Sequence, residues 1–491
     1  MSETRTFLAF DLGASSGRAV LGTLRAGRAT LDELHRFDNG PVEHGGRLHW
    51  DLDAIVEHIK EGLRRAGAAG AKLDGLGIDT WGVDYGLLDA ADRLIHPPHH
   101  YRDPRTTGMM DHAFQVIPRE TIFARTGIQF MPLNTLYQLL ADRDAGDGRL
   151  DRAAILLFMP DILNWRLTGL KRTDATIAST SQCFDPVARR WAADLLTSLG
   201  LPTRIMPAAA RPATIVGPLL PPIAEQTGVG LVPVICPAGH DTACAVAAVP
   251  AEGEDWAYIS CGTWSLVGVE LDQPILTPEA LHAGVTNEIG AARTIRLLRN
   301  IAGLWILEQC RRVWVDAGFA LTHDDLIRLA EKAPPHRAFI DPDDPRFAPF
   351  GDMPQRIREF CAETGQPVPR TEAETARCVL ESLALKYGVV LDRIARLTRR
   401  IIRRIHLVGG GARNPLLCQC TADACGLPVH AGPVEATALG NVLLQAMAVG
   451  AVESLDHLRA ISRNSAGIRI FNPGDTAVWN NARARFEAIV P

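Results

Sequence analysis

Two short loops rich in glycine and hydroxyl side chains carry the residue types that can hold a phosphate group. Residues 10–18 (FDLGASSGR) and residues 260–265 (SCGTWS) each join two apolar, β-prone runs. Small residues let backbone N–H groups and hydroxyls converge on an anion. Each loop therefore predicts a β-hairpin with a phosphate-facing turn, in which Gly13 and Gly262 admit the anion and supply a positive φ. One such loop alone would be an ordinary hairpin turn, so the repetition carries the prediction.

The two loops lie about half a chain length apart, which indicates two related lobes that offer their hairpins to a shared cleft. Asp11 ends the first strand, where a carboxylate can hold a hydrated Mg²⁺ beside the phosphates. We expect the lobes to span residues 1–248 and 249–491. The layout resembles that of actin, the heat-shock chaperone ATPases and the sugar kinases. This resemblance implies an α/β, two-lobed, actin/hexokinase-like (ribonuclease H-like) fold with a central ATP and sugar cleft.

The composition is typical of a compact cytoplasmic enzyme. A chain of 491 residues is too long for one core and suits two large lobes. Charged residues make up 22% and the formal net charge is −5, so no polybasic surface points to nucleic acid or to a membrane. Neither a signal peptide nor a membrane-spanning apolar run is found, and nothing marks an obligate protein partner. We therefore expect a cytoplasmic protein whose ten cysteines are reduced.

Cysteine spacing raises two further hypotheses. Cys418, Cys420 and Cys425 have metal-like spacing but fall in a predicted helix with no fourth ligand nearby, so zinc is not expected there. Cys361 and Cys378 can pair only if their backbones approach each other, and the sequence leaves this open. Cysteine usage therefore predicts neither a metal site nor a definite disulfide.

The elements that must position the loops follow from the periodicity of apolar residues. A third strand is expected around residues 30–37, and a helix begins after Asp51 with apolar residues at helical spacing. Residues 76–79 predict a short buried strand. In the second lobe, residues 371–397 predict a long helix capped by Thr371.

An aspartate follows another predicted strand, residues 232–235, just before the lobe boundary. It is Asp241, within the sequence PAGHDT at residues 237–242. Such a carboxylate can simply cap the following helix, or it can accept the proton of a substrate hydroxyl during phosphoryl transfer. His240 beside it either hydrogen-bonds a sugar oxygen or is a neutral structural histidine. The position before the boundary favours a place in the cleft.

Two further segments are candidates for ligand contact. Gly409, Gly410 and Gly411 lie between a predicted strand and a helix, where the backbone can approach nucleotide phosphate or sugar closely. On the first lobe, the polar groups of residues 82–84 and 101–105 can meet sugar hydroxyls or belong to an ordinary polar surface. The chain contains no Walker sequence, no G-x-G-x-x-G after a strand and no His-Arg-Asp loop. P-loop kinases, Rossmann dehydrogenases and protein kinases are therefore poor fits.

Several segments together resemble the rhamnulokinase branch of the FGGY carbohydrate kinases. The matching segments are residues 11–18 (DLGASSGR), 77–84 (GIDTWGVD), 101–103 (YRD), 131–139 (MPLNTLYQL), 159–161 (MPD), 260–266 (SCGTWSL), 300–305 (NIAGLW) and 432–436 (GPVEA). The resemblance implies ATP-dependent, Mg²⁺-supported phosphorylation of L-rhamnulose at its 1-hydroxyl in L-rhamnose degradation. The alternatives are another ketose or polyol of the family, such as L-fuculose, D-xylulose or glycerol, and a sugar-independent ATPase switch on the same lobes.

The resemblance also implies roles for individual residues. Asp241 is similar to the family's proton acceptor. Positions that match the sugar-binding residues are Gly82, His240, Asp241, Thr242 and Asn300, and positions that match the ATP-binding residues are Ala14, Ser15, Ser16, Gly17, Arg18, Thr263, Glu308, Gly409, Gly410 and Gly411. Relatives carry glutamine at the position of Glu308. An added carboxylate there would repel phosphate unless it faces Mg²⁺ or solvent, so the role of Glu308 is left open.

Overall fold

The computed structural model describes residues 4–474 and 476–490, and these form two compact units that interleave along the chain. The first unit comprises the chain up to Pro250, Glu270–Leu297 and Ala436–Ser465. The second comprises Ala251–Val269, Leu298–Glu435 and the chain from Ala466 onward. The chain therefore crosses from one unit to the other inside two strands, β16 (Trp264–Leu271) and β18 (Ile295–Ala302).

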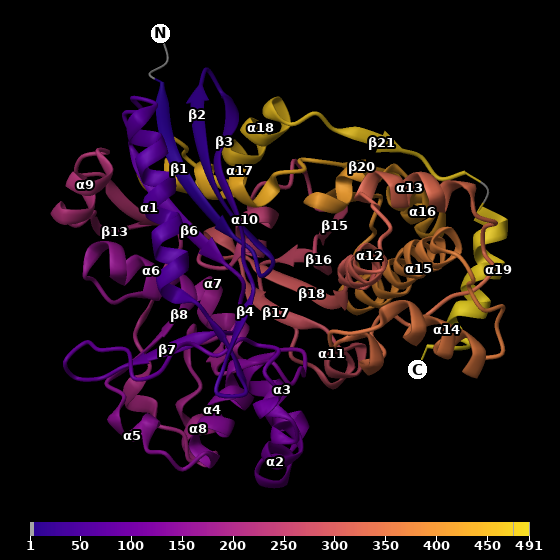
Figure 1. The fold of residues 1–491 in the computed structure, drawn as a ribbon, viewed down its shortest axis with the longest axis horizontal. Helices are drawn as coiled ribbons and strands as arrows, with labels where there is room; N and C mark the ends of the chain where they lie inside the picture. The colour runs from indigo at the N-terminus through magenta and orange to yellow at the C-terminus, as the bar shows by residue number, and fades with distance from the viewer. Residues whose placement is uncertain (1–3, 475, 491) are drawn as a thin grey trace. The chain divides into compact units, whose positions relative to one another are not determined.

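The first unit is built on a six-stranded sheet (Figure 1). Its order is β13-β14-β6-β1-β2-β3, with β13 Thr214–Pro218, β14 Pro233–Cys236, β6 Gly75–Thr80, β1 Arg5–Leu12, β2 Ser16–Arg25 and β3 Arg28–Asp38. The expected hairpin is confirmed, because β1 and β2 pair antiparallel from Arg5 opposite Leu24 to Leu12 opposite Gly17. The expected third strand is β3. On the other side of β1, strands β6 and β14 run parallel to it, and β13 closes the edge antiparallel.

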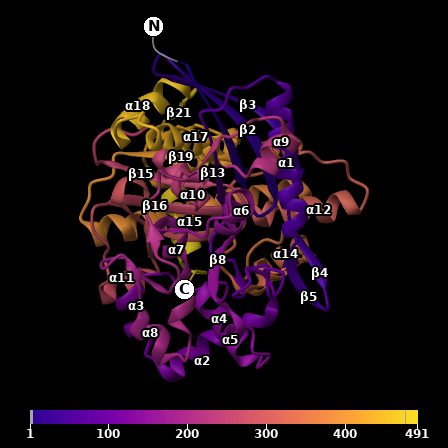
Figure 2. The ribbon, with the colours of Figure 1, turned by 90° about the vertical axis from the view of Figure 1, so that its left-hand side faces the viewer.

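Apolar residues on both faces of this sheet explain why it is covered by helices on both sides. Along β1, Leu8 and Phe10 belong to one buried cluster, whereas Phe7 and Ala9 belong to another, as the alternation of a strand requires. The first cluster includes residues of α1 (Leu52–Ala68), α6 (Met159–Thr168) and α9 (Pro221–Thr227). The side chain of Asp51 caps α1, as expected. The helices α1 and α9 lie side by side (Figures 1 and 2). The second includes α10 (Asp241–Ala247), α17 (Ala436–Ala448) and α18 (Leu455–Ser465).

The helices α10 and α17 approach each other unusually closely, through a glycine. A Cβ on Gly440 would lie 1.9 Å from the carbonyl oxygen of Cys244, so only glycine fits there. The residue at position 440 is therefore small because of helix packing. The helix itself begins at Ala436.

The second unit repeats the pairing pattern of the first. Its strands follow the order β18-β16-β15-β19-β20-β21, with β15 Trp256–Cys261, β19 Arg404–Val408, β20 Val429–Ala431 and β21 Arg469–Phe471. A hairpin (β15, β16) is followed by two strands parallel to its first strand (β19, β20) and an antiparallel edge strand (β21). The second predicted hairpin is therefore confirmed, together with the internal repeat.

Helices form the apolar core of this unit. The expected long helix is α15, Glu372–Thr398, and Thr371 caps it by accepting a hydrogen bond from the Glu374 N–H at 3.2 Å. It packs against α16 (Pro415–Cys425) and α19 (Thr476–Glu487) through side chains such as Leu385 and Phe486. Among the residues described, no helix combines the length and apolarity that a bilayer crossing needs.

All ten cysteines are free thiols in the structure. Cys361 on α14 (Met353–Glu363) and Cys378 on α15 are buried, and a hydrogen bond between the two thiols lowers the pKa of Cys361. The backbones of these two residues therefore come close enough for their side chains to touch.

Candidate active site

Three carboxylates meet at the carboxyl ends of three neighbouring parallel strands in the first unit. Asp11 lies near the end of β1, Asp79 near the end of β6 directly beside it, and Asp241 just beyond β14. The Thr80 N–H donates to the Gly239 carbonyl at 2.9 Å, which fixes the approach to Asp241 against β6. Ligand sites in α/β sheets form at this edge, where strands of the same direction end together.

Asp241 is the first residue of α10, and His240 is the residue at the cap position. The Asp241 carboxylate accepts hydrogen bonds from the Thr242 N–H at 2.5 Å and the Thr242 hydroxyl at 3.1 Å. An N-cap side chain instead accepts from an N–H two or three residues further on. The side chain of Asp241 keeps 28% of its surface exposed, so a ligand can reach it.

Two buried charged side chains, Arg296 and Glu288, interact with His240 next to Asp241. His240 Nδ1 accepts a hydrogen bond from Arg296 Nη2 at 3.1 Å, which leaves the proton on Nε2, 3.3 Å from Asp241 Oδ1. Arg296 is fully buried on β18 and pairs with Glu288 on β17 (Thr286–Ile289) at 3.1 Å. Arg296 and His240 hold the pKa of Glu288 below its usual range, although burial opposes this. His240 is thus a buried histidine that contacts both Arg296 and Asp241.

Burial and mutual repulsion make the carboxylates of this group harder to ionise. Burial raises the pKa of Asp79 well above its usual value, and the neighbouring Asp11 raises it further. The pKa of Asp241 is also raised, first by desolvation and then by Asp11, against the effect of His240. Asn441 Nδ2 donates to Asp79 Oδ2 at 2.6 Å, but Asp79 Oδ1 is buried and has no hydrogen-bond partner among the described residues. Oxygen donors with unmet bonding capacity fit a hard cation such as Mg²⁺.

The first hairpin turn is closed by its own backbone. The Gly13 N–H donates to the Ser16 carbonyl at 3.0 Å, and Asn39 Nδ2 donates to the Gly13 carbonyl at 2.7 Å. Arg18 pairs with Asp11 across the two strands. Ser15 is exposed at the tip, whereas a Cβ on Gly17 would lie 2.2 Å from the Phe37 ring. Gly17 is therefore small because of packing against Phe37.

The expectation that Gly13 and Gly262 supply a positive φ is wrong. Neither residue is among the glycines in the left-handed region, whereas Gly409 is, with φ 84°. A Cβ on Gly13 would lie 3.3 Å from the Ser16 carbonyl oxygen, and one on Gly262 would meet nothing within 4 Å. The close Ser16 carbonyl limits the space at Gly13, whereas neither packing nor backbone conformation within the protein requires a glycine at position 262.

Gly82 lies in the first unit, next to a group of buried polar side chains that are hydrogen-bonded to Asp84. A Cβ on Gly82 would lie 3.1 Å from the Thr180 hydroxyl. Beside it, the buried Asp84 accepts hydrogen bonds from Trp50 Nε1 (2.6 Å), Trp81 Nε1 (3.0 Å), the Tyr101 N–H (3.1 Å) and Gln138 Nε2 (2.9 Å). Burial raises the pKa of Asp84 to about 6 against these bonds. Asp84 thus holds the segment of Tyr101 in place.

The charged residues that follow Tyr101 divide between internal and surface contacts. Arg105 bonds to Gln138 and, at 2.8 Å, to Asp142. The Arg102 guanidinium lies over the Tyr101 ring at 5.3 Å. Arg105 therefore belongs to the interior of the unit.

The second hairpin turn, in the other unit, is held by the start of a helix. The Leu304 and Trp305 N–H groups, at the beginning of α12 (Trp305–Asp316), donate to the carbonyls of Gly262 (3.0 Å) and Thr263 (3.1 Å). Below the turn, the Ser265 hydroxyl lies 2.7 Å from the Tyr387 hydroxyl, within a buried neutral group. Gly262 is exposed at the tip.

The three glycines after β19 differ in the space that a Cβ atom would have. A Cβ on Gly409 would lie 2.9 Å from the Cys261 carbonyl oxygen, and one on Gly411 would lie 2.3 Å from Cys261 Sγ. Gly410 is exposed, and a Cβ there would meet nothing within 4 Å. The triple glycine therefore packs the turn onto β15 through two residues and leaves the third open. The helix α16 follows, capped by Asn414.

Two remaining sequence-predicted residues also lie in the second unit. Asn300 is half-buried on β18. Glu308, in the first turn of α12, binds Arg311 at 2.9 Å, Arg312 at 3.3 Å and His323 at 3.0 Å. Burial works against its ionisation, but His323 and Arg311 lower its pKa to about 2. Protein cations thus neutralise the carboxylate, which answers how a glutamate is tolerated at this position.

Sequence reasoning missed Asp79, Glu288 and Arg296 as members of the site. Asp79 was placed only in a buried strand, and the other two lie far from Asp241 along the chain. The one available signal was a charged residue inside an otherwise apolar strand, which is costly unless it is paired.

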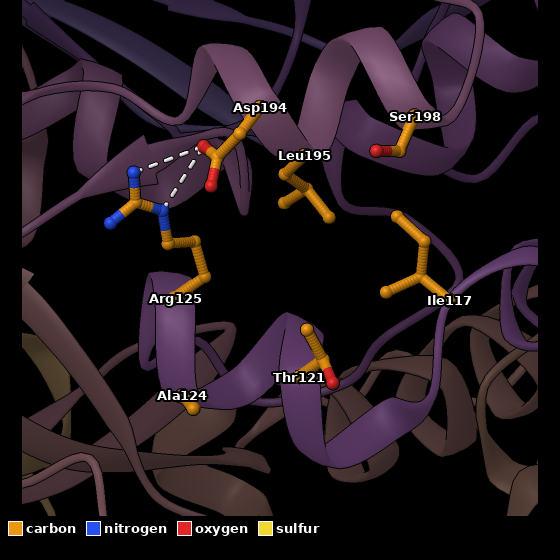
Figure 3. Close-up of a pocket in the computed structure, with 7 residues that line it drawn as sticks. All are labelled: Ile117, Thr121, Ala124, Arg125, Asp194, Leu195 and Ser198. Carbon is orange, nitrogen blue, oxygen red and sulfur yellow. Dashed lines mark hydrogen bonds and ion pairs between the residues drawn. The ribbon is translucent and has the colours of Figure 1, made fainter.

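A separate hollow of about 310 Å³ lies between α3 (Arg119–Thr126) and α8 (Ala193–Ser198) (Figure 3). Arg125 and Asp194 pair across its rim at 3.0 Å, as the dashed lines show. None of the sequence-predicted site residues lines it. It is therefore distinct from the group around Asp241.

Comparison with known proteins agrees with this architecture. Residues 6–248 match the N-terminal domain, and residues 257–449 the C-terminal domain, of the FGGY family of carbohydrate kinases. A rhamnulokinase of Bacteroides thetaiotaomicron is 44% identical over 99% of both chains. One of Enterococcus faecalis is 40% identical over 98% of this chain and 97% of that protein.

Solved structures with lower identity share the fold. A ligand-bound xylulose kinase from Lactobacillus acidophilus superposes with a TM-score of 0.82 at 18% identity, covering 99% of this chain and 97% of that one. The glycerol kinase of Plasmodium falciparum with ADP gives 0.74 at 13% identity, covering 99% and 97%. Together with the two domain matches and the full-length relatives, these likenesses agree with the fold described above. The chain belongs to the FGGY family of carbohydrate kinases, in its rhamnulokinase branch.

Proposed function

We propose that this kinase transfers the γ-phosphoryl group of ATP to the 1-hydroxyl of L-rhamnulose, giving L-rhamnulose 1-phosphate and ADP in L-rhamnose degradation. The names of the full-length relatives support the choice of sugar. The observation that carries the chemistry is Asp241, a ligand-accessible carboxylate with a raised pKa at the meeting point of three strand ends. Because ATP is supplied in the cytoplasm, we propose that the enzyme works there.

Asp241 accepts the proton of the attacking hydroxyl in this proposal. The sugar oxygen forms a bond to the γ-phosphorus as the bond from phosphorus to the β,γ-bridging oxygen of ATP breaks, and the proton passes to Asp241 Oδ. The raised pKa of Asp241 suits a base that must hold a proton late in transfer. His240 Nε2–H keeps the carboxylate oriented. Because the transition state for phosphoryl transfer is loose, orientation of the hydroxyl counts at least as much as basicity.

The sugar is held in the N-terminal lobe, residues 1–248, by Gly82, His240, Asp241 and Thr242, with Asn300 from the other lobe. Gly82 supports this assignment because it is half-buried beside the hydrogen-bonded group around Asp84. Buried hydrogen-bonding groups of this kind reject a sugar that lacks the matching hydroxyl.

The nucleotide is held mainly by the C-terminal lobe, residues 249–491, through Thr263 and the three glycines at residues 409–411. The open positions of Gly262 and Gly410 support close approach of phosphate to the backbone. From the first lobe, residues 14–18 contribute the hairpin tip and the positive charge of Arg18. Asp11 and the unpartnered Asp79 Oδ1 fit a Mg²⁺ ion that accompanies ATP. When bound, Mg²⁺ neutralises charge on the phosphates.

The experiment that tests the function identifies the product. Purified enzyme with ATP, Mg²⁺ and L-rhamnulose should release ADP, and phosphorus–proton correlation NMR should place the phosphate ester on C1. A sugar-independent ATPase would release ADP equally well without sugar, and that result would overturn the proposal.

A further inference from the structure

Three histidines of the first unit converge in a place that the phosphoryl-transfer mechanism does not use. His49 lies on β5 (Arg47–Trp50), and His96 and His99 lie in the segment that follows β7 (Tyr85–Leu88). One ring nitrogen of each lies within 4.8 Å of one ring nitrogen of the other two. The ring centroids are 4.4 Å apart for His49 and His99, and 4.9 Å apart for each of the other pairs.

The backbone fixes this convergence. His49 and His99 form an antiparallel bridge, with the Trp50 N–H donating to the Pro98 carbonyl at 2.9 Å and the His100 N–H to the Leu48 carbonyl at 2.9 Å. The segment of residues 96–100 is therefore attached to β5 as a short extra strand. His49 and His99 are buried, whereas His96 is half-buried and gives solvent access to the cluster.

Hydrogen bonds set the tautomers of two of the rings. His49 Nδ1 and His96 Nδ1 lie 3.2 Å and 2.8 Å from the same acceptor, the Pro97 carbonyl oxygen. A carbonyl can only accept, so both Nδ1 atoms carry the proton and both Nε2 atoms carry the lone pair. Metal-binding histidines commonly donate their other N–H to a backbone carbonyl in this way.

Charged side chains of both signs lie around the cluster. Arg105 and Arg149, which would repel a cation, are both paired with Asp142, at 2.8 Å and 3.1 Å. The Asp103 carboxylate, which interacts electrostatically with His49, offers a nearby negative charge.

We propose that His49, His96 and His99 form a zinc site that fastens the segment of residues 96–100 to β5. Three converging imidazoles are a donor set that Zn²⁺ takes readily. Zn–N bonds of about 2.1 Å at tetrahedral angles place nitrogens roughly 3.4 Å apart. The nitrogens, now within 4.8 Å of one another, must therefore approach by up to about 1.4 Å when the ion binds.

The test measures binding of Zn²⁺ to full-length, tag-free enzyme that has been stripped with a chelator. Competition with a chromophoric chelator should give one tight zinc per chain, and Co²⁺ should give the intense visible absorption of a four- or five-coordinate site. His96→Gln should weaken zinc binding at least about 100-fold, since even outer-shell changes cost 10–100-fold. The exposed His282→Gln, on α11 (Pro278–Ala283), is the matched control and should bind like the wild type.

Thermal unfolding gives a second, independent measurement of zinc binding. Zinc should raise the melting temperature of the wild type and of His282→Gln but not of His96→Gln, because a ligand that binds only the folded state stabilises it. His96 is half-buried, so the variant is expected to fold. Absence of stoichiometric binding, or tight zinc that survives His96→Gln, would overturn the proposal.

Discussion

The two sheets of this kinase share the order of six strands, to which the second sheet adds the edge strand β17, and they differ in the residues at the strand ends. In the first unit the ends of β1 and β6 and the start of the helix after β14 carry Asp11, Asp79 and Asp241. In the second unit the corresponding end of β15 carries Ser260 and Cys261, and the end of β19 runs into glycines. One framework therefore presents carboxylates in one copy and neutral backbone in the other.

The difference shows how the two copies of a duplicated fold can take different parts in phosphoryl transfer. Carboxylates can accept a proton and hold a cation, but they repel the oxygens of a phosphate. Small neutral turns do the reverse, because their N–H groups donate hydrogen bonds to an anion at close range. We therefore assign the reacting hydroxyl to the acidic copy and the nucleotide to the neutral one. The following predictions test or sharpen that division.

The largest expected effect is on the rate. Asp241→Asn keeps the size of the side chain and removes the base, so kcat should fall by about 10²–10⁴-fold. Steady-state kinetics measure this, and calorimetric titration should show that sugar and ATP still bind. If Asp241 were only a helix cap, asparagine would replace it almost without loss. Near-wild-type kcat at an unchanged melting temperature would therefore remove the base from the mechanism.

Asp84, which sits behind the acidic side, should make the first unit less stable as pH rises. Its pKa in the folded protein is about 6, above the 3.8 of an unperturbed carboxyl, so the folded state holds the proton more tightly. From pH 4 to pH 6 the stability of the wild type relative to Asp84→Asn should fall by about 2 kcal/mol. Denaturant unfolding at several pH values measures this. Loss of an acceptor in the variant adds a constant offset, so a flat difference would contradict the prediction.

On the neutral side, the effect should fall on nucleotide affinity. Gly262→Val and Gly410→Val place a branched side chain in open space, and neither glycine has a positive φ. We expect the KM for ATP to rise at least about tenfold, which is about 1.4 kcal/mol, with little change in melting temperature. Gly411→Val is the control, because its Cβ would collide with Cys261 Sγ and destabilise the fold. Unchanged ATP affinity in both open-position variants would make these turns purely structural.

The smallest expected change in stability concerns Glu308, and its dependence on pH should be opposite in sign to that of Asp84. Its cationic partners lower its pKa from 4.5 to about 2, so its stabilising contribution is present above pH 4.5 and is lost as pH falls toward 2. Because the pairs are partly exposed, the difference between the wild type and Glu308→Gln should be about 1 kcal/mol or less. Unfolding between pH 6 and pH 3 measures this, and added salt should reduce it. A difference that grows on acidification would contradict the prediction.

The sequence was sufficient for the local features of both units and insufficient for contacts between distant segments. Both hairpins, the strand β3 and the caps Asp51 and Thr371 follow from local periodicity and side-chain chemistry, and the structure confirms them. Asp79 gains its meaning only from lying beside Asp11 in the sheet, which no local pattern reveals. The positive φ expected at Gly13 and Gly262 was wrong because both turns form without a left-handed residue at these positions.

The pairing of Glu308 illustrates the same limit on a single helix. Arg311 and Arg312 lie within four residues of it, so two of its partners could have been predicted from helical spacing. His323 comes from a different helix and could not. The supporting pair of Glu288 and Arg296 likewise depends on tertiary structure that brings two strands to His240.

The central claim, that the acidic copy selects and activates L-rhamnulose, is tested most directly by comparing kcat/KM across a panel of sugars with an ADP-release assay. Buried polar groups such as those around Gly82 and Asp84 should leave a wrong epimer with unpaired hydrogen bonds. We predict that kcat/KM for L-rhamnulose exceeds that for L-fuculose, D-xylulose and glycerol by at least about tenfold, a difference of about 1.4 kcal/mol. Equal or higher kcat/KM with any of these competitors would contradict the account.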